Sequence, residues 1–248
     1  MIKQELPFAY RFRPDNENTL NELDKSYVYF QSPRLLNDPF DCYPSLLTFT
    51  QNKTELKLLF QVLEQTMSVS DKTKFRNEIL NNDFVDFRNF VADYFKSFIN
   101  KFGIACFSLS PSNLLMWSHY SNFHKGVCLM YDTSKDKKAF HRIRPMDYKE
   151  KFLQKEFKPL SEGNEFEHIL YSKSDVWRNE YELRVVKEKQ GEFSVNRDSL
   201  RTIIFGMQTC ESYKEKILEL TRDKYPELYY YNCEPLPDKF GLRFTQIG

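Results

Sequence analysis

The chain has 248 residues and a formal net charge of +1, so no global electrostatic field draws it towards nucleic acid or a membrane surface. This length suits one large domain or two small ones and suffices to bury a full hydrophobic core. No stretch approaches the ~18 apolar residues of a membrane span, and the first residues lack a secretory signal, so we expect no membrane association. The cysteines are scattered without a C-x-x-C pair, which argues against structural zinc and indicates a reducing cytoplasm.

The first elements are predicted to be two strands around a short helix. Residues 8–13 alternate aromatic with other residues, so the aromatic rings share one face of a strand. Arg11 and Arg13 then project from the other face. Residues 16–25 are predicted to form a helix with an Asn or Thr near its cap, and residues 27–32 a second strand.

The segment after the second strand differs from its surroundings. Prolines interrupt residues 33–44, which are predicted to form a loop. In residues 54–101 the apolar side chains recur at helical spacing, so we predict two or three amphipathic helices inserted between strands. Such helices could form a lid, a surface that binds a partner, or part of the packing.

The remaining chain mixes strands and helices. Strands are predicted at residues 103–110, 126–132, 141–150, 181–189, 201–206, within 226–235 and at 242–247. A helix or turn is predicted at residues 112–121, and helices are predicted near 163–175 and at 211–225. This order predicts one α+β domain over residues 1–248, with a mixed, largely antiparallel sheet and the helical insertion at 54–101.

The arginines of the first strand are the first candidate binding groups. A guanidinium matches a diphosphate or a carboxylate bidentately, so Arg11 and Arg13 together could clamp such an anion. The alternative is a solvated strand face that carries no function.

The loop sequence LNDPFD is the second candidate. Asn37 and Asp38 precede Pro39, and Asx side chains before proline commonly shape a turn. The functional alternative is contact with a ligand, or Mg²⁺ binding by Asp38 and Asp41. Their spacing matches no known calcium loop.

The third candidate is the aromatic run around WSHY. Trp117 and Tyr120 could stack on a planar ring such as nicotinamide or a base. Three nearby side chains could supply hydrogen bonds: Ser108, Ser118 and His119. His119 and His124 do not share one face of a continuous helix, so they are a weak zinc pair. The alternative is an aromatic cluster packed in the core.

The fourth candidate is the pair of glutamates in WRNEYELR. On a strand, Glu180 and Glu182 would project from the same face, and their repulsion would raise the pKa of one of them. Arg178 and Arg184 could serve as their cationic partners. An E-x-E pair at the start of a strand can hold a ribose hydroxyl and polarise a departing nicotinamide.

The order of NDPFD, WSHY and W-x-x-E-x-E-x-R over roughly residues 8–206 resembles a bacterial family, domain-of-unknown-function family 2971. That family carries no established reaction. Some of its members resemble parts of defence or toxin modules. The resemblance therefore implies a context, an anti-phage effector or a toxin with a partner protein or antitoxin, rather than a reaction.

The layout also resembles the ADP-ribosyltransferase superfamily, which implies a split sheet and NAD as substrate. A basic residue on the first strand, a serine on a middle strand and a glutamate on a later strand correspond to Arg11 or Arg13, Ser108, and Glu180 with Glu182. The resemblance implies catalytic roles for Glu182, Glu180 and His119. The residues expected to bind the nucleotide are Arg11, Arg13, Asn37, Asp38, Ser108, Trp117, Ser118 and Tyr120. The acceptor could be a protein or a nucleic acid. No Ser-Thr-Ser motif follows Phe107, and WSHY has no counterpart in that superfamily.

Two other functions stay open from the sequence. A metal-dependent nuclease could use Asp38, Asp41, Glu180, Glu182 and a histidine, although neutral net charge and the lack of a ligand motif weigh against it. A sensor without catalytic activity could instead bind a nucleotide in the aromatic pocket, and its ligand would stabilise it without turnover.

Overall fold

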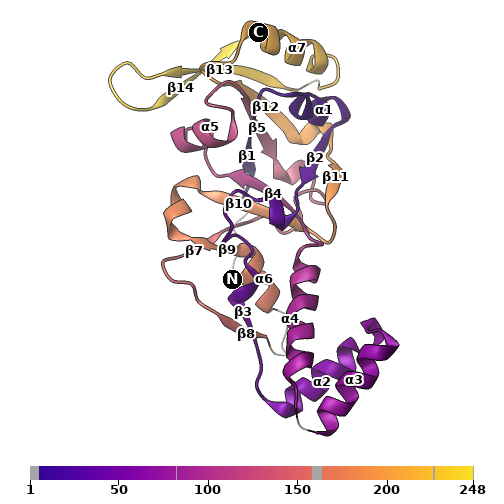
Figure 1. The fold of residues 1–248 in the computed structure, drawn as a ribbon. Helices are drawn as coiled ribbons and strands as arrows, with labels where there is room; N and C mark the ends of the chain where they lie inside the picture. Colours follow the sequence, from indigo (N-terminus) through magenta and orange to yellow (C-terminus); the bar gives the residue numbers. More distant parts are fainter. Residues whose placement is uncertain (1–5, 82, 158–163, 226, 248) are drawn as a thin grey trace. The chain divides into compact units, whose positions relative to one another are not determined.

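A computed structural model describes residues 6–81, 83–157, 164–225 and 227–247 (Figure 1). The chain divides into two compact units. The first, which we call the sheet unit, comprises Met1–Gln31, Gly103–Met146 and Val176–Gly248. The second, the helical unit, comprises Ser32–Phe102 and Asp147–Asp175.

The sheet unit is built on an eight-stranded sheet with the order β14-β13-β12-β5-β1-β4-β10-β6. Its strands are β1 (Phe8–Arg13), β4 (Gly103–Ser108), β5 (Val127–Asp132), β6 (Arg144–Pro145), β10 (Glu182–Lys187), β12 (Leu200–Phe205), β13 (Tyr229–Pro235) and β14 (Leu242–Ile247). Among these described strands β12 and β13 are parallel and the other neighbours antiparallel. The predicted α+β class with a mixed, largely antiparallel sheet is therefore confirmed. A separate pair joins β2 (Tyr27–Phe30) to β11 (Gly191–Ser194).

One face of the large sheet packs against α1 (Glu17–Lys25) and α7 (Glu211–Thr221). The hydrophobic core between this face and the two helices contains side chains from both. The strands contribute Ala9, Leu129, Leu183 and Ile203, and the helices contribute Leu23 and Ile217. The predicted helix near the N-terminus is confirmed, and the side chain of Asn16 caps it by accepting a hydrogen bond from the backbone N–H of Thr19 (3.1 Å).

The opposite face of the sheet carries α5 (Leu114–Tyr120), so α1 and α5 lie on opposite sides of β1 and β5 (Figure 1). A second apolar cluster fills this side: Phe12, Met116, Trp117, Cys128, Ile204 and Cys233. Because side chains alternate along a strand, the two clusters use alternate residues of the same strands. Ala9 belongs to the first cluster and Phe12 to the second, as the alternation in β1 predicted.

The helical unit contains α2 (Lys53–Leu63), α3 (Val69–Leu80), α4 (Val85–Ile99) and α6 (Asn164–Tyr171). Two parallel strand pairs complete it: β3 (Leu47–Phe49) with β8 (Lys155–Phe157), and β7 (Asp147–Lys149) with β9 (Ser172–Ser174). The amphipathic helices predicted within residues 54–101 are confirmed, and their apolar faces form a cluster that includes Leu56, Phe60, Phe87 and Val91. The unit also includes residues 147–175, so it is larger than the expected insertion. The single domain expected over residues 1–248 stays a prediction.

The strand predicted over residues 141–150 is wrong in its extent. It divides into β6 and β7, which belong to different units. Proline has no N–H to donate to a strand ladder, and the next residue, Met146, donates the last backbone hydrogen bond to β10, at the carbonyl of Glu182 (3.0 Å). No helix of the described residues is long and apolar enough to cross a membrane.

Candidate functional site

Three polar side chains form a row across neighbouring strands of the sheet unit. Ser108 of β4 lies directly opposite Glu182 of β10 and opposite Tyr10 of β1. Directly opposite residues of an antiparallel pair point to the same face, so these three side chains share the face that carries α5. We call this row, together with Glu180, Arg184 and Tyr120, the Glu182 cluster.

A buried ion pair fixes the carboxylate of Glu182. The Nε and Nη2 atoms of Arg184 both donate to Oε1 of Glu182, at 2.9 and 2.8 Å. Glu182 is 2% exposed and Arg184 is fully buried, so the pair is held in a low-dielectric environment. Because residues i and i+2 of a strand share a face, the strand geometry brings these two side chains together.

Glu180 does not lie on the same strand as Glu182, so the prediction that both carboxylates project from one strand is wrong. Glu180 ends a 3₁₀-helix (Asp175–Glu180), and β10 begins only at Glu182. Between them Tyr181 adopts a left-handed backbone with φ of 46°, which turns the chain. This turn places Glu180 outside the strand that carries Glu182.

Neighbouring hydroxyl groups hold Glu180 in place. The hydroxyl of Tyr120 donates to its Oε1 (2.6 Å), and the hydroxyl of Ser108 donates to its backbone carbonyl (2.7 Å). Glu180 is buried, and of these two contacts the one from Tyr120 reaches its carboxylate while the one from Ser108 holds its backbone. The structure thus brings together four of the predicted site residues: Ser108, Tyr120, Glu180 and Glu182.

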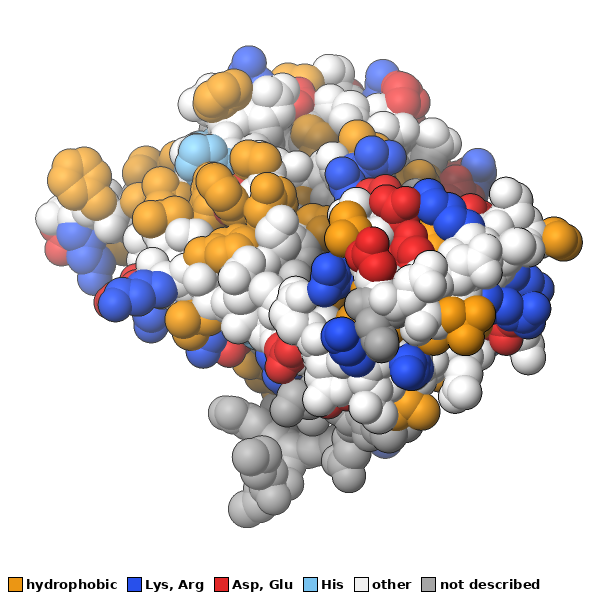
Figure 2. Space-filling view, turned by 60° about the horizontal axis from the view of Figure 1, so that its bottom comes forward, with side chains coloured by type: hydrophobic (Ala, Val, Ile, Leu, Met, Phe, Trp, Pro, Cys, Tyr) orange, Lys and Arg blue, Asp and Glu red, His pale blue; other side chains and the backbone are white. Residues whose placement is uncertain are grey.

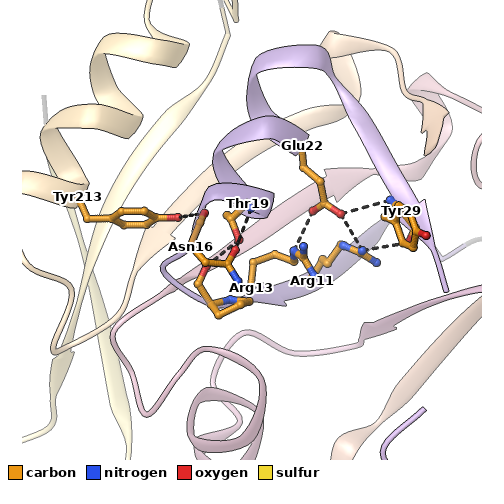
Figure 3. Close-up of polar contacts among 8 residues, drawn as sticks. Arg11, Arg13, Asn16, Thr19, Glu22, Tyr29 and Tyr213 are labelled. Carbon is orange, nitrogen blue, oxygen red and sulfur yellow. Dashed lines mark hydrogen bonds and ion pairs between the residues drawn. The ribbon is translucent and has the colours of Figure 1, made fainter. Parts of the chain in front are cut away.

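Arg11 and Arg13 lie on the other face of the sheet, where they bind Glu22 of α1 (Figure 3). Arg11 Nη2 lies 3.0 Å from Glu22 Oε1, and Arg13 Nε lies 2.8 Å from Oε2. The backbone N–H of Tyr29 also donates to Glu22 (3.2 Å). Burial and the neighbouring charge of Arg11 lower the pKa of Arg13. The carboxylate that the arginines bind belongs to the protein, so their predicted contact with a ligand stays a prediction, and the β1 side chain in the row is Tyr10.

Trp117 is not a platform for a ligand. Its side chain is fully buried, its ring packs edge-on against Phe12 with centroids 5.2 Å apart, and its Nε1–H donates to the carbonyl of Pro111 (2.7 Å). A ring with no exposed face cannot stack on a ligand. Trp117 is therefore part of a packed core cluster, which was the alternative to a ligand platform. The hydroxyl of Ser118 donates to the carbonyl of Leu114 within the helix (3.0 Å).

The outer side of α5 borders an open groove of about 510 Å³. It is lined by residues 12–16 and by His119, Tyr120 and Asn122. His119 is exposed, as a residue that points away from the sheet must be when its neighbour Trp117 is buried on the same helix. Tyr120 lines the groove and also donates its hydroxyl hydrogen bond to Glu180, so it lies between the groove and the Glu182 cluster.

Asn37 and Asp38 belong to the helical unit. Oδ1 of Asp38 accepts a hydrogen bond from the backbone N–H of Phe40 (2.9 Å), and its carbonyl accepts one from that of Asp41 (3.0 Å). The prediction that an Asx side chain shapes this turn is confirmed for Asp38. Asp41 lies 3.8 Å from the Nζ atom of Lys173 in a buried ion pair. Across the described residues no group of three or more His, Cys, Asp or Glu side chains is placed to hold a metal ion.

Sequence reasoning missed Tyr10 and the residues that line the groove beside α5. The alternation in β1 places Tyr10 on the face opposite to the arginines. It does not show that Glu182 lies on the same face as Tyr10. Asp15 and Asn122 lie in turns far apart in the sequence, and only the fold brings their side chains together (2.8 Å).

His124 has a lowered pKa because its ring is partly buried. The ring stacks on Trp117 with an interplanar angle of 11° and centroids 5.8 Å apart, and its backbone is left-handed with φ of 66°. Its Nδ1 atom is buried and has no hydrogen-bond partner among the described residues. Burial therefore favours the neutral imidazole in the folded protein.

We expect acid to destabilise the protein through His124. The pKa of this group is lower in the folded chain than in the unfolded chain, so at acidic pH the unfolded state binds the extra proton. Stability is fully present above the unfolded value of about 6.5 and is lost as pH falls through the lower folded value. Urea unfolding at pH 7.5 and 5.5 measures the change, and His124→Asn, which tolerates the left-handed backbone, should reduce it. An equal change in this variant would contradict the assignment.

Comparison with known proteins gives a match to a family, and it covers a segment that contains much of the Glu182 cluster. Searches of curated proteins and of solved structures found no match. Residues 116–185 run from α5 into β10 and include Tyr120, Glu180, Glu182 and Arg184. This segment, residues 116–185, matches the family described as protein of unknown function (DUF2971).

Proposed function

We propose that this protein cleaves NAD⁺ at the bond between nicotinamide and ribose and transfers ADP-ribose to an acceptor. The observation that carries the proposal is the row of Tyr10, Ser108 and Glu182 on one face of the sheet. Glu180 is held beside this row by Tyr120 and Ser108. A fixed carboxylate beside a second carboxylate and hydroxyl groups suits a reaction that develops positive charge on a ribose.

Glu182 stabilises the transition state in this proposal. When the bond between C1′ and the nicotinamide nitrogen breaks, its electron pair leaves with nicotinamide and the ribose becomes an oxocarbenium-like cation. A carboxylate that is already oriented needs no reorganisation at that moment. Arg184 supplies the orientation, because both of its donors end on Oε1 of Glu182.

Glu180 acts on the acceptor. The acceptor nucleophile forms a bond to C1′, and its proton passes to Glu180 as general base. Tyr120 positions that carboxylate through its 2.6 Å hydrogen bond. His119 stands exposed on the same helix and would contact the nucleotide from the groove.

The acceptor and the setting are further parts of the proposal. The acceptor is a protein, a nucleic acid or water, and the protein acts in the cytoplasm as a toxin or anti-phage effector. A partner protein or antitoxin would then control it. The matched segment of the uncharacterised family includes the proposed catalytic glutamates, which supports placing the activity there.

Release of nicotinamide from NAD⁺ tests the proposal. We expect the protein to release nicotinamide, and Glu182→Gln to lower kcat by about 10²–10³, the loss typical of one transition-state contact. Glutamine keeps the size of the side chain and an acceptor for Arg184, so the change removes mainly the charge. Glu192→Gln, at an exposed position on β11, is the matched control and should keep the full rate.

Two outcomes would overturn the proposal. One is a Glu182→Gln variant that keeps the full rate. The other is the absence of nicotinamide release with protein, RNA and DNA acceptors all supplied. Cleavage of nucleic acid that depends on Mg²⁺ or Mn²⁺ would support the nuclease instead, and stabilisation by NAD⁺ without turnover would support the sensor.

No observation on the described residues favours the nuclease. They hold no candidate metal-ligand group of three or more side chains. On the face shown in Figure 2, Lys and Arg side chains lie among Asp and Glu side chains rather than in one continuous basic surface. Nucleic-acid binding depends mainly on such a surface.

A further inference from the structure

The groove beside α5 has the size of a ligand site. Its volume of about 510 Å³ falls within the ~300–1,000 Å³ of small-molecule sites. Every residue that lines it belongs to the sheet unit, and the proposed function uses only His119 and Tyr120 among them. The proposed reaction therefore gives no role to the polar side chains of Asp15 and Asn122 in this lining.

A carboxylate and an amide are held together on one side of the groove. The Nδ2 atom of Asn122 donates to Oδ1 of Asp15 at 2.8 Å. Asn122 has a left-handed backbone with φ of 47°, which asparagine tolerates better than most residues. A carboxylate in a nucleotide site accepts hydrogen bonds from ribose hydroxyls, and the neighbouring amide adds a donor and an acceptor.

The charge of the groove suits a ligand without phosphate. The lining residue Arg13 is paired through its guanidinium with Glu22 at 2.8 Å. A phosphate placed in the groove would meet the carboxylate of Asp15, whereas a ribose would form hydrogen bonds with it.

Aromatic rings form another side of the groove. The rings of His119 and Tyr120 lie with centroids 6.4 Å apart and planes at 67°. His119 is exposed, so its ring has a surface that a planar base can contact. These rings, the carboxylate and the amide together match the two halves of a nucleoside.

We propose that this groove binds an uncharged nucleoside moiety, with its ribose hydroxyls on Asp15 and Asn122 and its base against His119 and Tyr120. The proposal rests on the proposed function in one respect, since the moiety would be the adenosine part of NAD⁺. Tyr120 connects the two sites because its ring lines the groove and its hydroxyl binds Glu180 at 2.6 Å.

Calorimetric titration with adenosine tests the groove without any turnover. Adenosine should bind the full chain, and Asp15→Asn and His119→Ala should each weaken binding at least about tenfold, which is about 1.4 kcal/mol. Two exposed positions provide matched controls, Asp223→Asn and His141→Ala, and both should bind as the unchanged protein does. In the nicotinamide assay Asp15→Asn should raise KM for NAD⁺ and leave kcat within about twofold, as expected of a binding contact.

Failure of the groove and failure of the reaction are distinguishable. Absence of adenosine binding, equal binding by Asp15→Asn, or tighter binding of adenosine monophosphate than of adenosine would overturn the nucleoside groove, even where NAD⁺ is cleaved. Adenosine binding that depends on Asp15 supports the groove, even where no nicotinamide is released. In that case the proposed reaction alone fails.

Discussion

Replacing Glu22 with glutamine is expected to lower the free energy of unfolding by about 3–5 kcal/mol, the cost of removing one partner from a buried ion pair. Glu22 is 2% exposed and faces both Arg11 and Arg13, at 3.0 and 2.8 Å. Without its charge, the buried guanidinium of Arg11 and the partly buried one of Arg13 stay beside a neutral amide. Glutamine has the same size, so the loss comes from charge and not from packing. Urea unfolding followed by circular dichroism at pH 7.5 measures it.

The matched control for Glu22 is Glu17, an exposed residue in the first turn of the same helix. Glu17→Gln should change the free energy of unfolding by no more than about 0.5 kcal/mol. A Glu22→Gln variant that is equally stable would show that the cluster contributes little. Because this cluster lies on the opposite face from Glu182, the folded Glu22→Gln protein should also keep its kcat for nicotinamide release. A large fall in KM for NAD⁺ would support direct binding of the nucleotide by the arginines, because the change releases them from a competing carboxylate.

The local structure of the sheet unit was accessible from the sequence wherever a short-range pattern decides it. Alternation in residues 8–13 predicted which side chains of β1 share a face, and Asn16 marked the start of α1. The same pattern could not identify what each face packs against. Glu22 becomes the partner of Arg11 and Arg13 only because α1 folds back onto β1, and this packing is a tertiary event.

The candidate site shows the same limit. The run WSHY predicted a helix with useful side chains, but not which of them point to the sheet. Neighbouring helical residues are rotated by about 100°, so burial of Trp117 leaves His119 on the exposed side. The sequence also could not reveal the turn at Tyr181, because a left-handed backbone is uncommon for residues other than glycine. That single backbone conformation decides how Glu180 and Glu182 are related.

Replacing Arg184 with methionine should destabilise the protein by about 3–5 kcal/mol at pH 7.5. Methionine fills similar space, but it removes both hydrogen bonds to Oε1 of the buried Glu182. Arg222→Met, at an exposed position after α7, is the matched control and should stay within about 0.5 kcal/mol of the unchanged protein.

A double-variant cycle shows whether Arg184 acts through Glu182. If the arginine serves mainly to hold that carboxylate, then Arg184→Met costs little once residue 182 is glutamine, and the two changes together cost about 1–3 kcal/mol less than their sum. Additive changes would mean that Arg184 stabilises β10 through other contacts, and the orientation of Glu182 would need another source. The cycle uses unfolding alone, so it tests the geometry on which the proposed reaction depends even before a substrate is known.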